Sequence, residues 1–206
     1  MIGGNLTQNY AKVTKLPTFK IGLIGGTDSS NGSGLHADLQ TAEKMNCHAI
    51  PAISAITLQN NPQNVRIFPV SPDGLNGQLN ELLKVDLHAI KIGMLPDRSS
   101  VQIVCDFLDA IPCPKVVLDP VHSTSSGHPL ITQEGWNLLL ENLLPRVGLV
   151  TPNLDEVVHM LGKEFLDETN PVKLVNQWIG SRTKSILLKG GQNPTELGTD
   201  FLLEEN

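Results

Sequence analysis

Short apolar runs rich in β-branched residues recur along the chain, and stretches with apolar residues three or four positions apart lie between most of them. The runs predict strands at residues 19–24, 47–54, 87–92, 115–118, 147–150 and 185–188. The spaced pattern predicts helices at residues 35–45, 72–84, 99–110, 133–144, 154–161 and 172–180. Strands and helices that alternate in this way predict an α/β fold around a mostly parallel sheet.

Two of the predicted helices begin with a clear capping signal. Ser71 precedes Pro72, and Asn170 precedes Pro171. A polar side chain at the cap accepts a backbone N–H, and a proline in the first helical position loses no hydrogen bond. We therefore expect helices to start at these two points.

Length and composition favour one domain. The chain has 206 residues, 40% of them hydrophobic, which is enough for one sizeable core. We expect this domain to cover residues 19–206, after an N-terminal extension of residues 1–18. The formal net charge of -6 and the absence of a Lys/Arg run argue against nucleic acid as a partner.

The cysteines and the N-terminal residues indicate the compartment. Cys47, Cys105 and Cys113 have no zinc-binding spacing, and free thiols in a reducing environment explain them most simply. The first seventeen residues lack the continuous apolar stretch that a secretory signal or a membrane span requires. The sequence thus predicts a cytoplasmic protein without a membrane partner.

A glycine-rich segment, residues 25–34, follows the first predicted strand and leads into a predicted helix that carries Asp38. Glycines permit close backbone approach, and the exposed N–H groups at a helix start favour anionic or polar ligands. In an open parallel sheet, ligands bind beyond the carboxyl ends of the strands, where this segment lies. An ordinary flexible connection is the alternative interpretation.

The chain matches one nucleotide-binding pattern only in part and lacks another. Residues 32–37 match the dinucleotide pattern G-x-G-x-x-A, but these glycines come several residues after the strand, and no acidic residue closes the second strand. No G-x-x-x-x-G-K-[ST] string occurs in the chain, which excludes a P-loop. A nicotinamide-dependent oxidoreductase therefore remains only a distant alternative.

Several motifs resemble, in order and spacing, those of the hydroxymethylpyrimidine/phosphomethylpyrimidine kinase family, within the ribokinase-like superfamily. The first is similar to A-G-[ST]-D-x-[SG]-G-G-A-G-[IL]-x-A-D-[LI]-K-T and the second to I-T-A-[LI]-x-x-Q-N. The matching segments are residues 25–41, 53–60, 91–95, 116–121, 126–130, 149–156 and 189–191. Together the resemblance covers roughly residues 19–203.

The resemblance implies a fold and an activity. The fold is a ribokinase-like three-layer α/β/α domain with a mostly parallel central sheet. The activity is ATP-dependent phosphorylation of 4-amino-5-hydroxymethyl-2-methylpyrimidine, its monophosphate or both, in thiamin biosynthesis. ATP and Mg²⁺ are the implied cofactors, and a homodimer is a possible assembly because family relatives are often dimers.

By the resemblance, Gly26, Asp38, Gln59, Met94 and Val121 surround the pyrimidine substrate. An aminopyrimidine presents ring-nitrogen acceptors and an amine donor, so a carboxylate together with an amide satisfies both kinds of group. Without the resemblance, Asp38 would be read as a solvated acid near a helix start, and Gln59 as a polar residue at a strand end.

A second group of residues is implied on the phosphate side. Asp119 and Glu156 suit an indirect magnesium shell, since Mg²⁺ keeps several waters and uses few carboxylates. Asn153 matches a residue near the nucleotide phosphates, and Lys189 matches a nucleotide-side lysine. The structural alternatives are a capping box between Asn153 and Glu156 and a solvated Lys189.

The chain departs from the family pattern in several places. Ser125 and Gln192 replace a lysine and a histidine, and the family's V-M-x-x-K-S-G begins here with Val121 and His122. Asn31 stands where the family has a glycine. The change is a minor one, because asparagine adopts left-handed backbone conformations more readily than most residues. The family's G-T-G-[CD] segment is expected beyond Asn206, and the catalytic base and the anion hole with it.

Two explanations of these departures stay open. The chain is either a truncated or split kinase, whose domain lacks its C-terminal part, or a degenerate relative that binds a pyrimidine without phosphorylating it. A pyridoxal kinase of the same superfamily is a further alternative.

Overall fold

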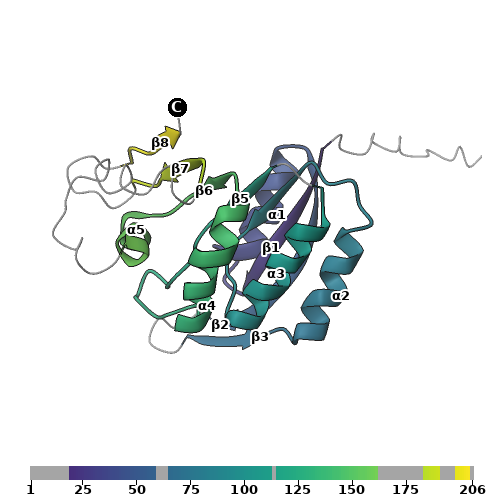
Figure 1. Ribbon diagram of the computed structural model, residues 1–206, viewed down its shortest axis with the longest axis horizontal. Helices are drawn as coiled ribbons and strands as arrows, with labels where there is room; N and C mark the ends of the chain where they lie inside the picture. Colours follow the sequence, from purple (N-terminus) through teal and green to yellow (C-terminus); the bar gives the residue numbers. More distant parts are fainter. Residues whose placement is uncertain (1–18, 59–64, 113–114, 162–182, 191–197, 205–206) are drawn as a thin grey trace, which may run out of the picture.

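The computed structural model describes residues 19–58, 65–112, 115–161, 183–190 and 198–204, and one sheet of eight strands runs through them (Figure 1). The spatial order of the strands is β3-β2-β1-β4-β5-β6-β7-β8. The strands are β1 (Phe19–Asp28), β2 (Cys47–Leu58), β3 (Arg66–Pro69), β4 (Ala89–Ile92), β5 (Val116–Leu118), β6 (Leu149–Val150), β7 (Ser185–Leu188) and β8 (Phe201–Glu204).

The six inner strands pair in parallel, and the two edge strands, β3 and β8, run antiparallel to their neighbours. β1 lies between β2 and β4, so the chain leaves β1 toward one edge of the sheet and later proceeds from β4 toward the other. In sheets of this kind, ligands bind where the strand order reverses. The carboxyl ends of β1 and β4 are therefore the expected place for a site.

Helices cover both faces of the sheet. Helices α2 (Pro72–Leu82), α3 (Arg98–Ala110) and α4 (Gln133–Leu138) lie side by side on one face, and α1 (Gly34–Lys44) packs on β1 and β2 from the other (Figure 1). Right-handed crossovers require this, because the β1-to-β2 connection runs in the opposite direction to those that follow β4. Helix α5 (Leu154–Leu161) follows β6.

Apolar side chains from the sheet and from the helices on both sides form the core. The inner strands contribute Ile24, Ile92, Leu118 and Val150, all fully buried. On the helix side they pack in one cluster with residues such as Leu79 and Val104. The polar ends of the strands are thus fixed on a rigid base.

All six predicted strands and the helices predicted within the described residues are present, although several boundaries differ. β1 continues through Gly25 and Gly26 to Asp28, so the loop is shorter than the predicted turn. The edge strands β3 and β8 were not predicted. The helix predicted at 133–144 ends at Leu138 and continues as a π-helical turn, Leu139–Leu143, and a 3-10 turn, Leu144–Arg146.

The smaller predictions have mixed outcomes. Ser71 caps α2 by accepting the N–H of Gly74 at 3.2 Å, as expected. Cys47 and Cys105 are free, as expected. Residues 1–18, Gln59, Cys113, the cap at Asn170 and the helix at 172–180 lie outside the described residues. Within the described parts, no helix has the length and apolar character needed to cross a membrane.

Candidate active site

Asp28, the last residue of β1, shapes the loop that leads into α1. Its buried carboxylate accepts hydrogen bonds from the Ser30 N–H at 2.9 Å, the Ser30 hydroxyl at 2.6 Å and the Ser33 hydroxyl at 2.7 Å. Burial raises the pKa of Asp28, but these hydrogen bonds outweigh it and lower the pKa below its ordinary value. The loop is therefore held by an ionised carboxylate.

Two residues of this loop need left-handed backbone. Asn31 has φ 63°, which is the conformation expected for the asparagine that replaces a glycine. Gly34 has φ 61°, and a Cβ atom there would lie 2.5 Å from the carbonyl oxygen of Gly26. Only glycine fits this close approach of α1 to β1.

A cavity of about 310 Å³ opens at the carboxyl ends of β1 and β4, at the expected switch point of the sheet. Four of the five predicted substrate residues line it: Gly26, Asp38, Met94 and Val121. The fifth, Gln59, lies outside the described residues. The predicted substrate residues within the described part of the chain therefore gather around one cavity, and the role of each stays a prediction.

Asp38 is not the solvated acid that the simpler interpretation suggested. Its Oδ2 atom lies 2.7 Å from the Nζ of Lys91 on β4, and the two side chains are only 22% and 29% exposed. Both residues line the cavity. Sequence reasoning gave Lys91 no role, although a lysine inside an otherwise apolar strand is a signal that could have found it.

Three predicted phosphate-side residues also meet. The Nζ of Lys189 lies 2.7 Å from Oδ1 of Asp119 and 3.9 Å from Oε2 of Glu156, and the Thr151 hydroxyl donates to the same Asp119 oxygen at 3.3 Å. Lys189 is thus a paired lysine rather than a solvated one. Asp119 also lines the first cavity, so the two groups of residues adjoin.

The carboxylates of Asp119 and Glu156 limit the kind of magnesium site that can form here. Among the described residues, no group of three or more His, Cys, Asp or Glu side chains is arranged to hold a metal. Two neighbouring carboxylates fit an ion held largely by waters and by a ligand's phosphates, as Mg²⁺ often is. They do not fit a closed metal site.

The predicted capping box at the start of α5 is present. Asn153 Oδ1 accepts the N–H of Glu156 at 2.8 Å, and Glu156 Oε2 accepts the N–H of Asn153 at 2.7 Å. The backbone N–H of His122, in the segment after β5, lies close enough to the Glu156 carboxylate to lower its pKa slightly. Burial raises the pKa of Glu156, the neighbouring Asp119 adds to this, and the two N–H donors and Lys189 only partly offset it.

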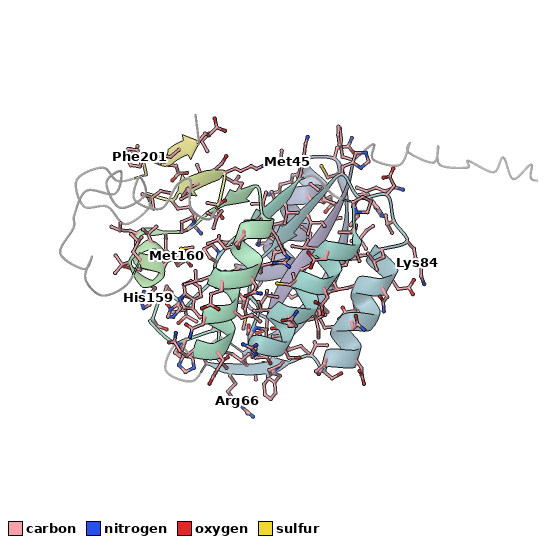
Figure 2. The ribbon with its side chains drawn as sticks, in the orientation of Figure 1. Met45, Arg66, Lys84, His159, Met160 and Phe201 are labelled. Carbon is pink, nitrogen blue, oxygen red and sulfur yellow. The ribbon has the colours of Figure 1, made fainter. Side chains whose placement is uncertain are left out.

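A second cavity, of about 220 Å³, lies between the segment after β5 and α5, and Asn153, Glu156, His122 and His159 contribute to its lining. The ring of His122 packs 4.1 Å from His159 and 4.8 Å from Trp136, measured between centroids. Figure 2 labels His159 on α5. Among the described residues, no group pairs with the buried Nδ1 of His122, whose pKa is lowered by burial and by His159.

Ser123, Thr124 and Ser125 line both cavities, so one segment lies between the predicted pyrimidine side and the predicted phosphate side. A family model described as phosphomethylpyrimidine kinase matches residues 28–206. The chain belongs to the phosphomethylpyrimidine kinase family. This confirms the resemblance found in the sequence.

Individual relatives agree with the family. A hydroxymethylpyrimidine/phosphomethylpyrimidine kinase from Aquifex aeolicus is 31% identical over 88% of this chain and 71% of its own length. The Escherichia coli enzyme of the same name is 32% identical over 87% of this chain and 68% of its own length.

Solved structures confirm the ribokinase-like fold. A phosphomethylpyrimidine kinase from Clostridium difficile superposes with a TM-score of 0.77 at 25% identity, over 91% of this chain and 81% of that one. A Staphylococcus aureus pyridoxal kinase in complex with AMP-PCP has a TM-score of 0.79 at 24% identity, over 91% of this chain and 69% of that one. The second likeness concerns the fold alone.

Proposed function

We propose that this protein is a kinase that transfers the γ-phosphoryl group of ATP to 4-amino-5-hydroxymethyl-2-methylpyrimidine, to its monophosphate or to both, in thiamin biosynthesis. The observation that carries the proposal is the position of Asp119. It lines the cavity that holds the predicted pyrimidine residues, and it pairs with Lys189 on the predicted phosphate side. Acceptor and donor sites therefore adjoin, as phosphoryl transfer requires.

The first cavity suits an aminopyrimidine. Met94, Val121 and Leu130 give it apolar surface, and Asp38 and Lys91 give it polar groups. An aromatic ring loses water favourably against apolar side chains, while a carboxylate accepts from its exocyclic amine. Such a mixture of apolar wall and few polar groups is typical of small-molecule sites.

The phosphate side supplies charge. Lys189 pairs with Asp119 and lies 3.9 Å from Glu156, and we assign it to the nucleotide phosphates together with Asn153 at the start of α5. Asp119 and Glu156 would hold Mg²⁺ through water, and the bound ion would neutralise charge on the phosphates. Ser125 adds a hydroxyl donor but no charge, in contrast to the lysine of the family pattern.

The experiment that tests the proposal uses purified residues 1–206 with ATP, Mg²⁺ and the hydroxymethylpyrimidine. Mass spectrometry should detect the phosphorylated pyrimidine, with one ADP formed for each phosphoryl group transferred, and pyridoxal in place of the pyrimidine should give far less product. Calorimetric binding of the pyrimidine without any product would instead support the non-catalytic alternative. Preferred turnover of pyridoxal would contradict the proposed substrate.

We also infer a homodimer. Ile56 and Leu58 on β2 and Phe68 on β3 are exposed, and Ile56 and Phe68 face one another across the antiparallel pair. Exposed apolar side chains grouped in this way favour association. Light scattering during size-exclusion chromatography should give a mass twice that of one chain. Phe68→Glu should lower the measured mass to that of one chain.

A further inference from the structure

The ion pair between Lys91 and Asp38 joins a strand and a helix that both contribute to the lining of the first cavity. Lys91 lies on β4 and Asp38 on α1, 53 positions apart in the chain, and their charged atoms are 2.7 Å apart. Gly93 makes this reach possible, because a Cβ atom there would lie 3.0 Å from the Nζ of Lys91. The Gly93 N–H bonds to the Ile24 carbonyl at 2.7 Å, which fixes β4 against β1 beneath the pair.

The hydrogen bond uses only part of each group. Lys91 donates one ammonium proton to Oδ2 of Asp38, and within the described residues no other hydrogen bond is found for either side chain. No described residue takes Oδ1 of Asp38 or the other two ammonium protons of Lys91, and both side chains line the cavity in which a ligand would meet them. The site offers one acceptor beside a donor, with the two charges balanced.

We propose that Lys91 is a positioning residue that makes the cavity selective for a neutral amino heterocycle. Lys91 holds one oxygen of Asp38, so that the other oxygen is directed at a single amine, and it compensates the negative charge that a neutral ligand would otherwise cover. This inference rests on the proposed function of the cavity.

The physical reason is the cost of covering a charge. A neutral ring placed over an unpaired carboxylate removes its water and returns only one hydrogen bond, which is unfavourable. A carboxylate without Lys91 would instead favour a cationic ligand, whose charge replaces the missing ammonium. Because the Lys91–Asp38 pair is half-buried, solvent screens its charges only in part, and most of this electrostatic compensation remains.

A double-mutant cycle tests the proposal, with the Kd of the hydroxymethylpyrimidine measured by calorimetry on the full chain. Lys91→Met and Asp38→Asn should each raise this Kd about tenfold, because a truncated charge pair leaves its partner uncompensated. The double variant should also lose only about tenfold, since Lys91 acts through Asp38. Lys91→Arg should restore most of the affinity, and the Kd of AMP-PCP should not change in any variant.

The matched control is Lys84→Met. Lys84 forms a similar ion pair with Glu81, at 2.6 Å, on the exposed surface after α2 (Figure 2). It should leave both dissociation constants unchanged. If the double variant instead loses about a hundredfold in affinity, which is the product of the two single losses, the positioning role is wrong although the proposed function stands. If the unmodified protein does not bind the pyrimidine, the proposed function fails and this inference with it.

Discussion

The sulfur atom of Met94 lies 2.8 Å from the place that a Cβ atom on Gly26 would take. Gly26 is part of β1, Met94 follows the neighbouring strand β4, and both line the first cavity. The thioether therefore occupies the space that any other residue at position 26 would need. The shape of the cavity depends on this pair.

Gly26→Ala should displace Met94 into the cavity. Met is flexible, so we expect the free energy of unfolding to fall by only about 1 kcal/mol. The Kd of the pyrimidine should rise about tenfold, since one misplaced group in a pocket has an effect of this size. Chemical denaturation and calorimetry measure the two quantities. Gly77→Ala is the control, because nothing lies within 4 Å of its added Cβ, and it should lower neither stability nor affinity.

Glu156→Gln should separate the capping role from the phosphate-side role. Glutamine closes a capping box as glutamate does. It also removes the ionisable carboxyl group of Glu156, whose pKa is raised by burial. We expect no loss of stability at pH 7 but a loss of about a hundredfold in turnover. Glu156→Ala should lose turnover and also about 1 kcal/mol of stability. Unchanged turnover in Glu156→Gln would leave Glu156 with the structural role alone.

Lys189→Met should weaken nucleotide binding and spare pyrimidine binding. A hydrogen bond to a charged phosphate contributes enough that its loss should raise the Kd of AMP-PCP about tenfold. The Asp119 carboxylate would lose its ammonium partner at the same time. Lys184→Met is the control. It removes an exposed lysine just before β7, the strand that Lys189 follows, and should leave the Kd of AMP-PCP and of the pyrimidine unchanged. Equal weakening of both ligands by Lys189→Met would argue for a structural role.

His122 should make the protein less stable in mild acid. Its pKa in the folded protein lies below the ordinary value of 6.5, so the unfolded chain binds more protons between the two values. Its contribution is fully present above pH 6.5 and is lost as the pH falls toward the lowered value. Glu156 acts in the opposite sense, since its raised pKa lets the folded protein bind a proton more readily as the pH falls.

The measurement compares urea unfolding of the unmodified protein and His122→Met between pH 7.5 and pH 5.5. The variant should lose less stability over this interval, and the Glu156 contribution cancels in the comparison. His128→Met, at an exposed position, is the control for the loss of an imidazole. Identical losses in the unmodified protein and in His122→Met would contradict the prediction.

The inner sheet was predictable because buried parallel strands are continuous apolar runs. β3 and β8 were not, since each has only four residues with at most three apolar ones in a row, all half-buried or exposed at the edges of the sheet. The continuation of β1 to Asp28 was missed because Gly25 and Gly26 normally weaken a strand. In the fold they pair with Ile53 and Ala55 of β2, with a shift of register between them that the sequence does not signal.

The site was predictable to a similar degree. Asp119, Glu156 and Lys189 follow β5, β6 and β7, and carboxyl ends of parallel strands meet at one edge of a sheet. The pairing of Lys91 with Asp38 was not, because it depends on a side chain that reaches past Gly93 to a helix. The packing of His122 could not be predicted either, since its neighbours Trp136 and His159 come from two helices, α4 and α5.

The Glu156 carboxylate accepts the amide proton of Asn153 and lies beside the amide of His122, so the start of α5 and the segment after β5 meet at one side chain. The two walls of the second cavity should consequently move as a unit rather than independently. Local opening that withdraws the Glu156 side chain exposes both amides to water, so Glu156→Ala should speed hydrogen exchange at Asn153 and at His122. A ligand that tightens one wall would thereby slow exchange in both.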